Sequence, residues 1–529
     1  MPHEDGWYLA IDLGTGGTKV AAVDGWGNVR ASAFASIQTT ITPDGGATQD
    51  TDQWWLGIVQ SVRALVNGTS ASTVPDKCLG VGITGQWGST VPVDGDGRAI
   101  GPCLLWSDDR GGALSSDLVG GAVRVSGYGP RKLATWIRRA GGAPSPAGAD
   151  PTGHALHLRV NDPERYAAAR SLLEPIDFIG ACLTGRIAAT PASMVLSWLT
   201  DNRRGASASA VYDPELVRLS GRDPALLPPL HPTGSVLGPL TEAAAAELEL
   251  PVGLPVVGGV PDLHTAYLGS GALADYEGHL SISTTAWVSA AVPFKKTDVL
   301  RQMASIPGIR PGSYLIANNH ETGGATLRWF REAMYGGDDG PGSPPSYDEI
   351  TEAAAAVPPG AGGVLFTPWL KGERSPVDDR TLRGSFLNLS LSTDRAALSR
   401  AVLEGVAFNA AWLLEATEKF AGRPLHGLRI LGGGAQSDLW CQIHADVVGR
   451  PIGRTADPMH VNVRGAAWFA ALALGHLTMD DVARRAPAVS TFSPDPPAAR
   501  VYAPMYQEFR RIYRQQKAMY RRLNGRPGH

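Results

Sequence analysis

The chain has 529 residues, more than one hydrophobic core usually serves, so two large domains are expected. Its formal net charge is only −3 at pH 7, which argues against a partner recognised by overall charge, such as nucleic acid or an anionic membrane. The four cysteines lie far apart without metal-ligand spacing, which is typical of reduced cytoplasmic proteins. The N-terminus does not have the pattern of a signal peptide, and no window reaches the roughly 18 apolar residues of a membrane helix, so neither export nor membrane insertion is expected.

The first predicted element is a strand, a tight turn and a second strand over residues 8–24. Glycines let the backbone approach a ligand closely, while successive N–H groups and threonine hydroxyls can form a nest for phosphate oxygens. The candidate phosphate contacts are Gly14, Thr15, Gly16 and Thr18, and Asp12 just before the turn is a candidate for holding Mg²⁺ through water. An ordinary glycine-rich hairpin is an equally good interpretation, because the turn matches neither a Walker A nor a dinucleotide-binding motif.

Several segments then follow in chain order. Apolar residues at helical spacing predict a helix over residues 52–66, and residues 79–84 are typical of a buried strand that ends at Gly85-Gln86-Trp87-Gly88-Ser89. Residues 140–160 are rich in Gly, Pro and Ala, which predicts a long exposed loop followed by surface histidines, His154 and His157.

Near the midpoint of the chain, a short apolar strand runs into glycines, a single carboxylate, Asp262, and then small residues at helical spacing. This layout places Asp262 at the mouth of a cleft, beside a helix N-terminus. An acid there can be a general base, a metal ligand or a helix cap, and the cap is the commonest role for an isolated Asp. We expect the domain boundary just before this stretch, dividing the chain into residues 1–252 and 253–529.

A second strand-turn-strand is predicted over residues 279–292, with the hydroxyl side chains of Ser283 and Thr284 at its turn. Two such hairpins predict two similar αβ halves facing one cleft. A strand over residues 428–431 then enters three glycines, Gly432, Gly433 and Gly434, before another helix. Only glycine lets a backbone come close enough for the flat base or the α-phosphate of a nucleotide.

Two long helices are predicted in the second half of the chain. The first covers residues 395–420. The second, over residues 502–523, is amphipathic and basic; we expect it to pack one face on the protein and to solvate the other, rather than to bind RNA or a membrane.

Taken in order, these motifs resemble the FGGY carbohydrate kinase family, on its xylulokinase-like side. The residues that carry the resemblance are Ile11–Lys19, Gln49-Asp50, Trp54-Trp55, Gly85-Gln86, Leu105–Arg110, Lys132–Trp136, Asp262, Ser283–Thr285, Gly372–Pro376, Glu404-Gly405 and Gly432–Ala435. The resemblance implies an α/β fold of two actin-like (ribonuclease H-like) domains flanking a catalytic cleft. It also implies transfer of the ATP γ-phosphoryl group to a primary hydroxyl of a ketose or polyol.

The resemblance assigns roles to individual positions. Asp262 is the expected catalytic base and also contacts the substrate, and the other expected sugar contacts are Gln86, Trp87, Ser89 and Asp108. A salt-bridged loop is an alternative for Asp108. The phosphates are expected at Gly14, Thr15, Gly16, Thr18, Ser283 and Thr284, the nucleoside at Gly433, Gly434 and Asp438, and Mg²⁺ at Asp12.

The chain departs from its relatives at several points. Xylulokinases carry Met-His-Gly where Trp87-Gly88-Ser89 stands, and glycerol kinases carry Arg-Glu, so glycerol is disfavoured and the sugar is left open. Ser283 stands where relatives place glycine, and its side chain can either crowd the γ-phosphate or add a donor.

Two other function classes therefore stay open: a catalytically weak nucleotide-binding sensor or interaction protein of this fold, and an actin-like ATPase acting on proteins, which Gln86 and Asp108 argue against. We expect a small-molecule substrate, no nucleic acid or membrane partner, and a homodimer if the protein oligomerises.

Overall fold

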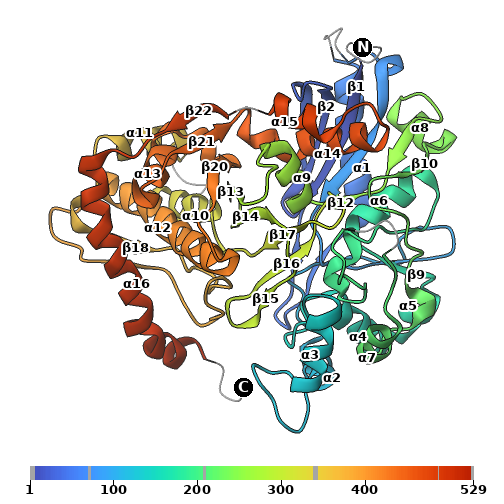
Figure 1. Ribbon diagram of the computed structural model, residues 1–529, viewed down its shortest axis with the longest axis horizontal. Helices are drawn as coiled ribbons and strands as arrows, with labels where there is room; N and C mark the ends of the chain where they lie inside the picture. Colours follow the sequence, from blue (N-terminus) through green and yellow to red (C-terminus); the bar gives the residue numbers. More distant parts are fainter. Residues whose placement is uncertain (1–5, 69–72, 207–209, 337–343, 487, 526–529) are drawn as a thin grey trace.

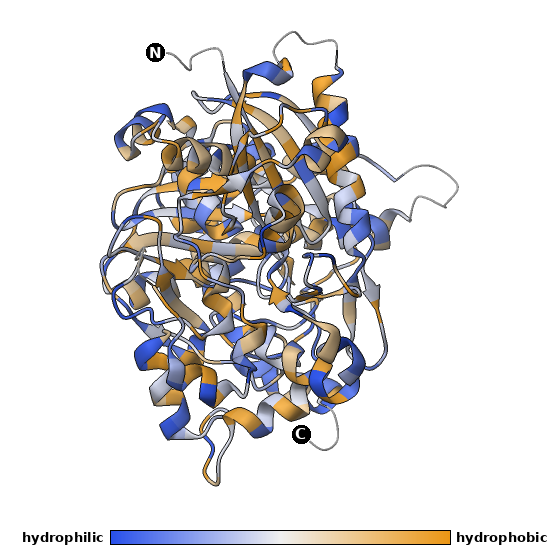
Figure 2. Ribbon diagram, turned by 90° about the vertical axis from the view of Figure 1, so that its right-hand side faces the viewer, coloured by the Kyte–Doolittle hydropathy of each residue, from blue (hydrophilic) through white to orange (hydrophobic). Residues whose placement is uncertain are grey.

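The computed structural model describes residues 6–68, 73–206, 210–336, 344–486 and 488–525. Two large sheets form the centres of two lobes that lie side by side (Figure 1). Most of the first lobe is blue and green and most of the second is yellow to red, but the orange-red segment over residues 461–473 packs on the first sheet. Along the exposed edges of the first lobe, hydrophilic segments lie on outer helices and loops, while apolar segments gather in its middle (Figure 2).

The first sheet has seven strands. In spatial order these are β10 (Val236–Pro239), β11 (Pro255–Val257), β6 (Cys78–Gly85), β1 (Trp7–Gly14), β2 (Gly17–Asp24) and β3 (Val29–Ser36), with β12 (Val260–Pro261) also paired to β6. The predicted hairpin is present as the antiparallel pair β1–β2, and β6 runs parallel to β1.

The second sheet has eight strands and repeats this plan. Its order is β15 (Thr297–Asp298), β16 (Met303–Pro307), β17 (Tyr314–Ala317), β14 (Ala286–Val292), β13 (Glu277–Ile282), β20 (His426–Leu431), β21 (Ile452–Thr455) and β22 (Ala488–Phe492). Here β13 and β14 form the antiparallel hairpin, and β20 is the parallel neighbour of β13. The turn after β20, which holds the three glycines, therefore corresponds to the turn after β6, which holds Gln86.

Helices cover both sheets. The first sheet packs against α1 (Thr51–Val66), α6 (Pro175–Thr184) and α8 (Glu242–Leu248) on one face, and against α9 (Asp262–Ser270) and α14 (Val461–Ala473) on the other. The second sheet packs against α10 (Ala325–Tyr335), α11 (Tyr347–Ala355), α12 (Arg395–Ala421) and α13 (Asp438–Val448). The other α-helices of the described residues are α2 (Gly112–Val119), α3 (Pro130–Arg139), α4 (Pro151–Asn161), α5 (Pro163–Ala168), α7 (Pro214–Ser220), α15 (Met479–Arg485) and α16 (Pro496–Asn524). Short strands complete the lobes: β4 (Thr40–Ile41), β5 (Ala47–Gln49), β7 (Val91–Val93), β8 (Cys103–Leu104), β9 (Ser171–Leu173), β18 (Leu365–Thr367) and β19 (Ser385–Leu387).

Strand alternation decides which side of the first sheet each residue of β1 faces. Leu9 and Ile11 pack with α1 and α6, whereas Tyr8 and Ala10 pack with α9 and α14. Since successive side chains point to opposite faces, Asp12 shares the face of Tyr8 and Ala10. Its carboxylate therefore lies on the side covered by α9.

The pair α9 and α14 lies between the two lobes. The apolar cluster around these helices takes Ala10 and Val23 from the first sheet and Trp287 and Ala291 from the second. Strands β11 and β12 are hydrogen-bonded to β6, so the chain first crosses to the second sheet after α9. A division at residues 252 and 253 stays a prediction, because the strands just beyond it pair with the first sheet.

The expectation of an exposed loop over residues 140–160 was wrong in its second half, which forms α4. Asp150 caps this helix by accepting hydrogen bonds from the N–H groups of Thr152 and Gly153, and Pro151 fits the first helical position. His154 is fully buried rather than on the surface, because it lies on the inner side of α4 and contacts Thr90.

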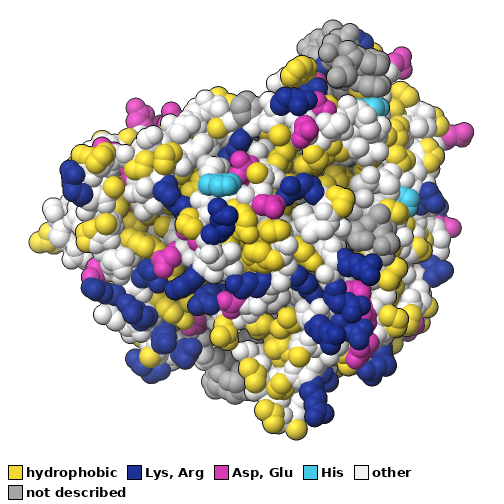
Figure 3. Space-filling view, viewed as in Figure 1, with side chains coloured by type: hydrophobic (Ala, Val, Ile, Leu, Met, Phe, Trp, Pro, Cys, Tyr) yellow, Lys and Arg dark blue, Asp and Glu magenta, His cyan; other side chains and the backbone are white. Residues whose placement is uncertain are grey.

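The two long helices of the second lobe are present. Helix α12 is the only helix among the described residues that is long and apolar enough to cross a membrane by length and composition, but 89% of its apolar window is buried inside the protein, as in a core helix. Helix α16 buries Tyr502, Phe509 and Tyr520 and leaves its basic residues outside, as predicted. Lys and Arg side chains gather over the lower half of the face in Figure 3, which includes α16.

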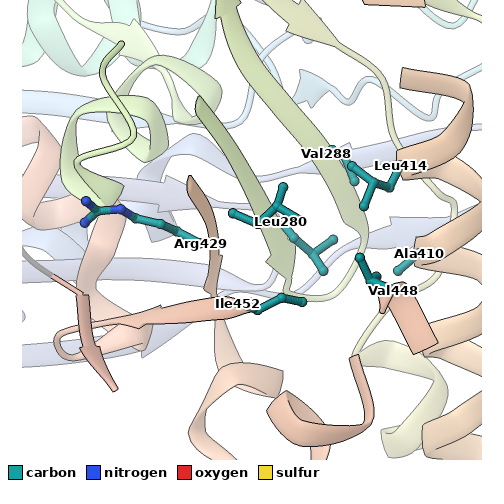
Figure 4. A pocket seen from close by; sticks show the side chains of 8 residues that line it. Leu280, Val288, Ala410, Leu414, Arg429, Val448 and Ile452 are labelled. Carbon is teal, nitrogen blue, oxygen red and sulfur yellow. The ribbon is translucent and has the colours of Figure 1, made fainter. Parts of the chain in front are cut away.

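A small apolar cavity of about 10 Å³ lies inside the second lobe, between its sheet and α12 (Figure 4). Leu280, Val288, Ala410 and Leu414 contribute to its lining. A cavity of this size and polarity is a packing defect of the core and cannot hold a nucleotide or a sugar.

Candidate active site

Asp262 lies where the first sheet meets the helix between the lobes. The parallel pairing places Pro261 opposite Gly85 on β6, and Thr84 of β6 opposite Asp12 on β1. Asp262 is the first residue of α9, Pro261 occupies the N-cap position, and no side-chain hydrogen bond caps the helix. The structure therefore does not use this carboxylate as the helix cap.

The surroundings of Asp262 favour its protonated form. Burial, and after it the negative charge of Asp12, raise its pKa to about 7. Hydrogen bonds from the Leu263 N–H and from Trp87 act in the opposite direction and lower this pKa. Burial also raises the pKa of Asp12, while the Lys19 ammonium and a hydrogen bond from Asn462 oppose this shift. Two partly desolvated carboxylates thus share one small region, one of them titrating near neutral pH.

A hydrogen-bond network fixes the first turn. The Thr15 hydroxyl donates to Gln86 Oε1 at 3.1 Å and accepts from the indole Nε1 of Trp106 at 3.2 Å. Gln49 donates through Nε2 to the Thr15 carbonyl at 2.7 Å and accepts from Gln86 at 3.2 Å. The candidate phosphate contact Thr15 and the candidate sugar contact Gln86 therefore belong to one network.

The second turn lies against the three glycines. A side chain at Gly432, whose φ is +91°, would come within 2.6 Å of the Ile282 carbonyl and 2.7 Å of Ser283 Oγ. Glycine is needed here because the backbone of one turn lies directly on the other. The structure thus brings Ser283 next to the turn that contains Gly433 and Gly434.

One contact joins the first hairpin to the region of the triglycine turn. Lys19, the cross-strand partner of Asp12, donates through Nζ to the carbonyl of Met459 at 2.6 Å. Met459 is also the nearest neighbour to a side chain added at Gly433, at 3.4 Å. The first turn, the carboxylate pair and the triglycine turn consequently converge on one region between the lobes.

The predicted sugar contacts have mixed surroundings. Trp87 is half-buried beside Asp262, whereas Ser89 is almost fully buried and its hydroxyl accepts from the Trp106 N–H at 2.9 Å. Asp108 is buried and forms the salt bridge that was its alternative role, at 2.6 Å from Arg110. Burial alone would raise the pKa of Asp108, but hydrogen bonds from Arg110 and a backbone N–H hold it below its usual range.

Four other predicted contacts differ in exposure. Thr284 and Gly16 are exposed at the tips of their turns, where a ligand can reach them. Thr18 is fully buried, and the alternation of β2 places its side chain on the α1 face, opposite Asp12. Asp438 has a side chain that is 76% exposed and paired with Arg454 on the surface. The binding roles of Thr18 and Asp438 stay predictions.

Sequence reasoning missed two residues of the site. Lys19 could have been found, because it follows from the two-residue period of a hairpin whose turn is known. Asn462 could not, since it lies 450 positions after Asp12 and only the packing of α14 brings it there. Among the described residues, no group of three or more His, Cys, Asp or Glu could hold a metal ion by itself.

Comparisons with known proteins show the family. The model of the FGGY family of carbohydrate kinases matches with its N-terminal domain over residues 7–120 and with its C-terminal domain over residues 283–474. A xylulose kinase of Staphylococcus epidermidis is 27% identical over 521 residues, covering 97% of each chain.

Solved structures share the architecture. The xylulose kinase of Rhodospirillum rubrum has a TM-score of 0.78 and 27% identity, covering 97% of this chain and 99% of its own. The gluconate kinase of Lactobacillus acidophilus has a TM-score of 0.82 at 20% identity, covering 98% and 99%. The fold is that of the actin-like ATPases, and the two family matches, which together cover more than half of the chain, show that it belongs to the FGGY family of carbohydrate kinases.

Proposed function

We propose that this kinase transfers the γ-phosphoryl group of ATP to a primary hydroxyl of a ketose or polyol, with Asp262 as the general base. The observation that carries the proposal is a carboxylate with a pKa of about 7 at the start of the helix between the lobes. Such a group is largely ionised at slightly alkaline pH and still basic enough to take a hydroxyl proton. The reaction forms a bond from the sugar oxygen to the γ-phosphorus and breaks the bond to the leaving ADP oxygen, while the hydroxyl proton goes to Asp262.

The two turns supply the charge stabilisation. Thr15, Gly16, Ser283 and Thr284 offer N–H and hydroxyl donors to the phosphates, and Gly433 with Gly434 leaves room for the nucleoside. Phosphoryl transfer asks mainly for alignment and for neutralisation of charge on the phosphate oxygens, so positioned donors account for much of the expected rate. Gly14, Thr18 and Asp438 complete the proposed nucleotide site.

The residues present also fit Mg²⁺. Asp12 and Asp262 are two half-buried carboxylates that interact with each other; burial raises the pKa of both, and the negative charge of Asp12 adds to the rise at Asp262. A divalent cation beside Asp12 would relieve this repulsion, and Mg²⁺ bound to ATP commonly needs only one or two protein carboxylates. When bound, the ion neutralises phosphate charge.

The sugar is proposed to contact Gln86, Trp87, Ser89, Asp108 and Asp262. Xylulose is the first candidate, because relatives named xylulose kinase match almost the whole chain. The indole of Trp87, where xylulokinases have Met, gives this pocket an aromatic face for a sugar ring or carbon chain. We place the reaction in the cytoplasm, in keeping with four free cysteines.

A substrate panel tests the proposal. D-xylulose, L-xylulose, other ketoses, polyols and gluconate are offered with ATP and Mg²⁺, and ADP release is measured with and without each compound. At least one ketose or polyol should stimulate release, and Asp262→Asn should abolish the stimulation without abolishing ATP binding. ATP binding that no sugar converts into turnover would refute the proposal and favour a sensor.

A further inference from the structure

A cation–π contact joins the two lobes beside the first phosphate turn. The guanidinium carbon of Arg374 lies 5.6 Å from the centre of the Trp106 ring. Trp106 follows β8 in the first lobe, whereas Arg374 lies in the segment between β18 and β19 of the second lobe. The contact therefore connects a residue of the first lobe with a residue of the second.

On the first lobe, Trp106 is attached directly to the site. Its indole N–H donates to the Thr15 hydroxyl, and its backbone N–H donates to Ser89 Oγ. Thr15 in turn donates to Gln86. A shift of the indole would therefore disturb both the phosphate turn and the turn proposed to contact the sugar.

On the second lobe, Arg374 is held by a buried acidic network. Its Nε donates to Glu321 at 2.9 Å, and its backbone N–H donates to Glu373 at 2.9 Å. Glu373 is fully buried and is fixed by His320 and Asn409, each at 2.8 Å. Hydrogen bonds to two acidic residues thus hold the arginine where it contacts Trp106.

We propose that Arg374 is a positioning residue that couples closure of the lobes to the alignment of Thr15 through the face of Trp106. The inference rests on the proposed function, since ATP must contact both lobes for closure to matter. The planar guanidinium can stack on the indole while Nε stays on Glu321, an arrangement that lysine cannot reproduce. Cation–π pairs of this kind support an effect of about 5- to 30-fold on affinity or rate when they are partly desolvated.

The chain provides a matched control. Arg380 also donates to Glu321 at 2.9 Å, but its side chain is 56% exposed, against 28% for Arg374. Arg374→Gln and Arg380→Gln each remove one positive charge that pairs with the Glu321 carboxylate. Only Arg374→Gln removes the contact with Trp106, which we call the latch. The pair of variants therefore separates the effect of losing a charge near Glu321 from the effect of losing the latch.

The test is a double-mutant cycle of Arg374→Gln and Trp106→Leu, measured by calorimetry as ATP affinity without sugar and by kinetics as kcat and KM. Each single variant should lose about 5- to 30-fold in ATP affinity, the double variant should lose no more than the worse single one, and Arg380→Gln should lose less than about threefold. Trp106→Phe keeps the ring face but not the N–H, so it should retain ATP affinity and lose kcat. Thermal unfolding identifies variants that fail to fold, in which case Trp106→Met, which also lacks a ring face, and Arg374→Lys replace them.

The outcomes separate the two proposals. Losses that multiply in the double variant, or an equal loss for Arg380→Gln, would overturn the latch even if the wild type phosphorylates a sugar. A non-additive cycle on ATP affinity would support the latch even if no sugar in the panel is phosphorylated, and the proposed function would then be the part that fails.

Discussion

Replacement of Asp262 by Asn removes the proposed base and keeps the shape of the side chain. Loss of a positioned base typically costs on the order of 10²- to 10⁴-fold in kcat. In the wild type the pKa of about 7 places half of the enzyme in the active, ionised form near neutral pH. The value of kcat/KM should therefore fall about tenfold per pH unit below about pH 7 and level off above pH 8.

Coupled measurement of ADP release between pH 5.5 and 9, at saturating ATP and varied sugar, provides the profile. Asp12→Asn removes the neighbouring negative charge, so the acid limb should move to lower pH even though turnover also drops. An Asp262→Asn enzyme with more than about a tenth of the wild-type kcat would refute the assignment. An acid limb centred near pH 4 would refute the electrostatic reasoning.

The same substitution has a consequence for stability. The folded-state pKa of Asp262 is raised, from 3.8 to about 7, so ionisation at neutral pH opposes folding, and stability is lost as the pH rises through about 7. The difference corresponds to roughly 4 kcal/mol as an upper bound, and solvent access reduces it to about 1–3 kcal/mol. Asp262→Asn should raise the unfolding temperature at pH 8 and give little gain at pH 4, and equal effects at the two pH values would contradict this cause.

Three further substitutions test the triglycine turn and the surroundings of the base. Gly432→Ala places a side chain at positive φ within 2.6 Å of the Ile282 carbonyl, so the free energies of ATP binding and of unfolding should each fall by about 1–3 kcal/mol. Gly433→Ala is the control: its side chain meets only Met459, at 3.4 Å, so this variant should unfold at the wild-type temperature. Trp87→Phe removes a hydrogen bond that lowers the pKa of Asp262, so the acid limb of the kcat/KM profile should move to higher pH, and an unchanged limb would show that the indole does not orient the base.

Local patterns identified much of the fold because they depend on neighbours in the chain. The two hairpins, the strand before the three glycines and the helix over residues 395–420 all follow from two- or 3.6-residue periods and from turn residues. The loop prediction fails over residues 151–161, because Asp150 and Pro151 begin a helix that tertiary burial stabilises, although Gly, Pro and Ala are frequent in loops.

The sequence by itself determined that two similar halves face a cleft, that Asp12 and Asp262 stand at strand ends, and that the chain resembles a carbohydrate kinase family. Tertiary structure alone decided that α9 lies between the sheets, that Asp12 faces it, and that the resulting burial and repulsion bring the pKa of Asp262 to about 7. It also decided the contact of Arg374 with Trp106. The physical reason is that desolvation and charge interactions depend on distances between residues hundreds of positions apart, and no local period of the chain encodes those distances.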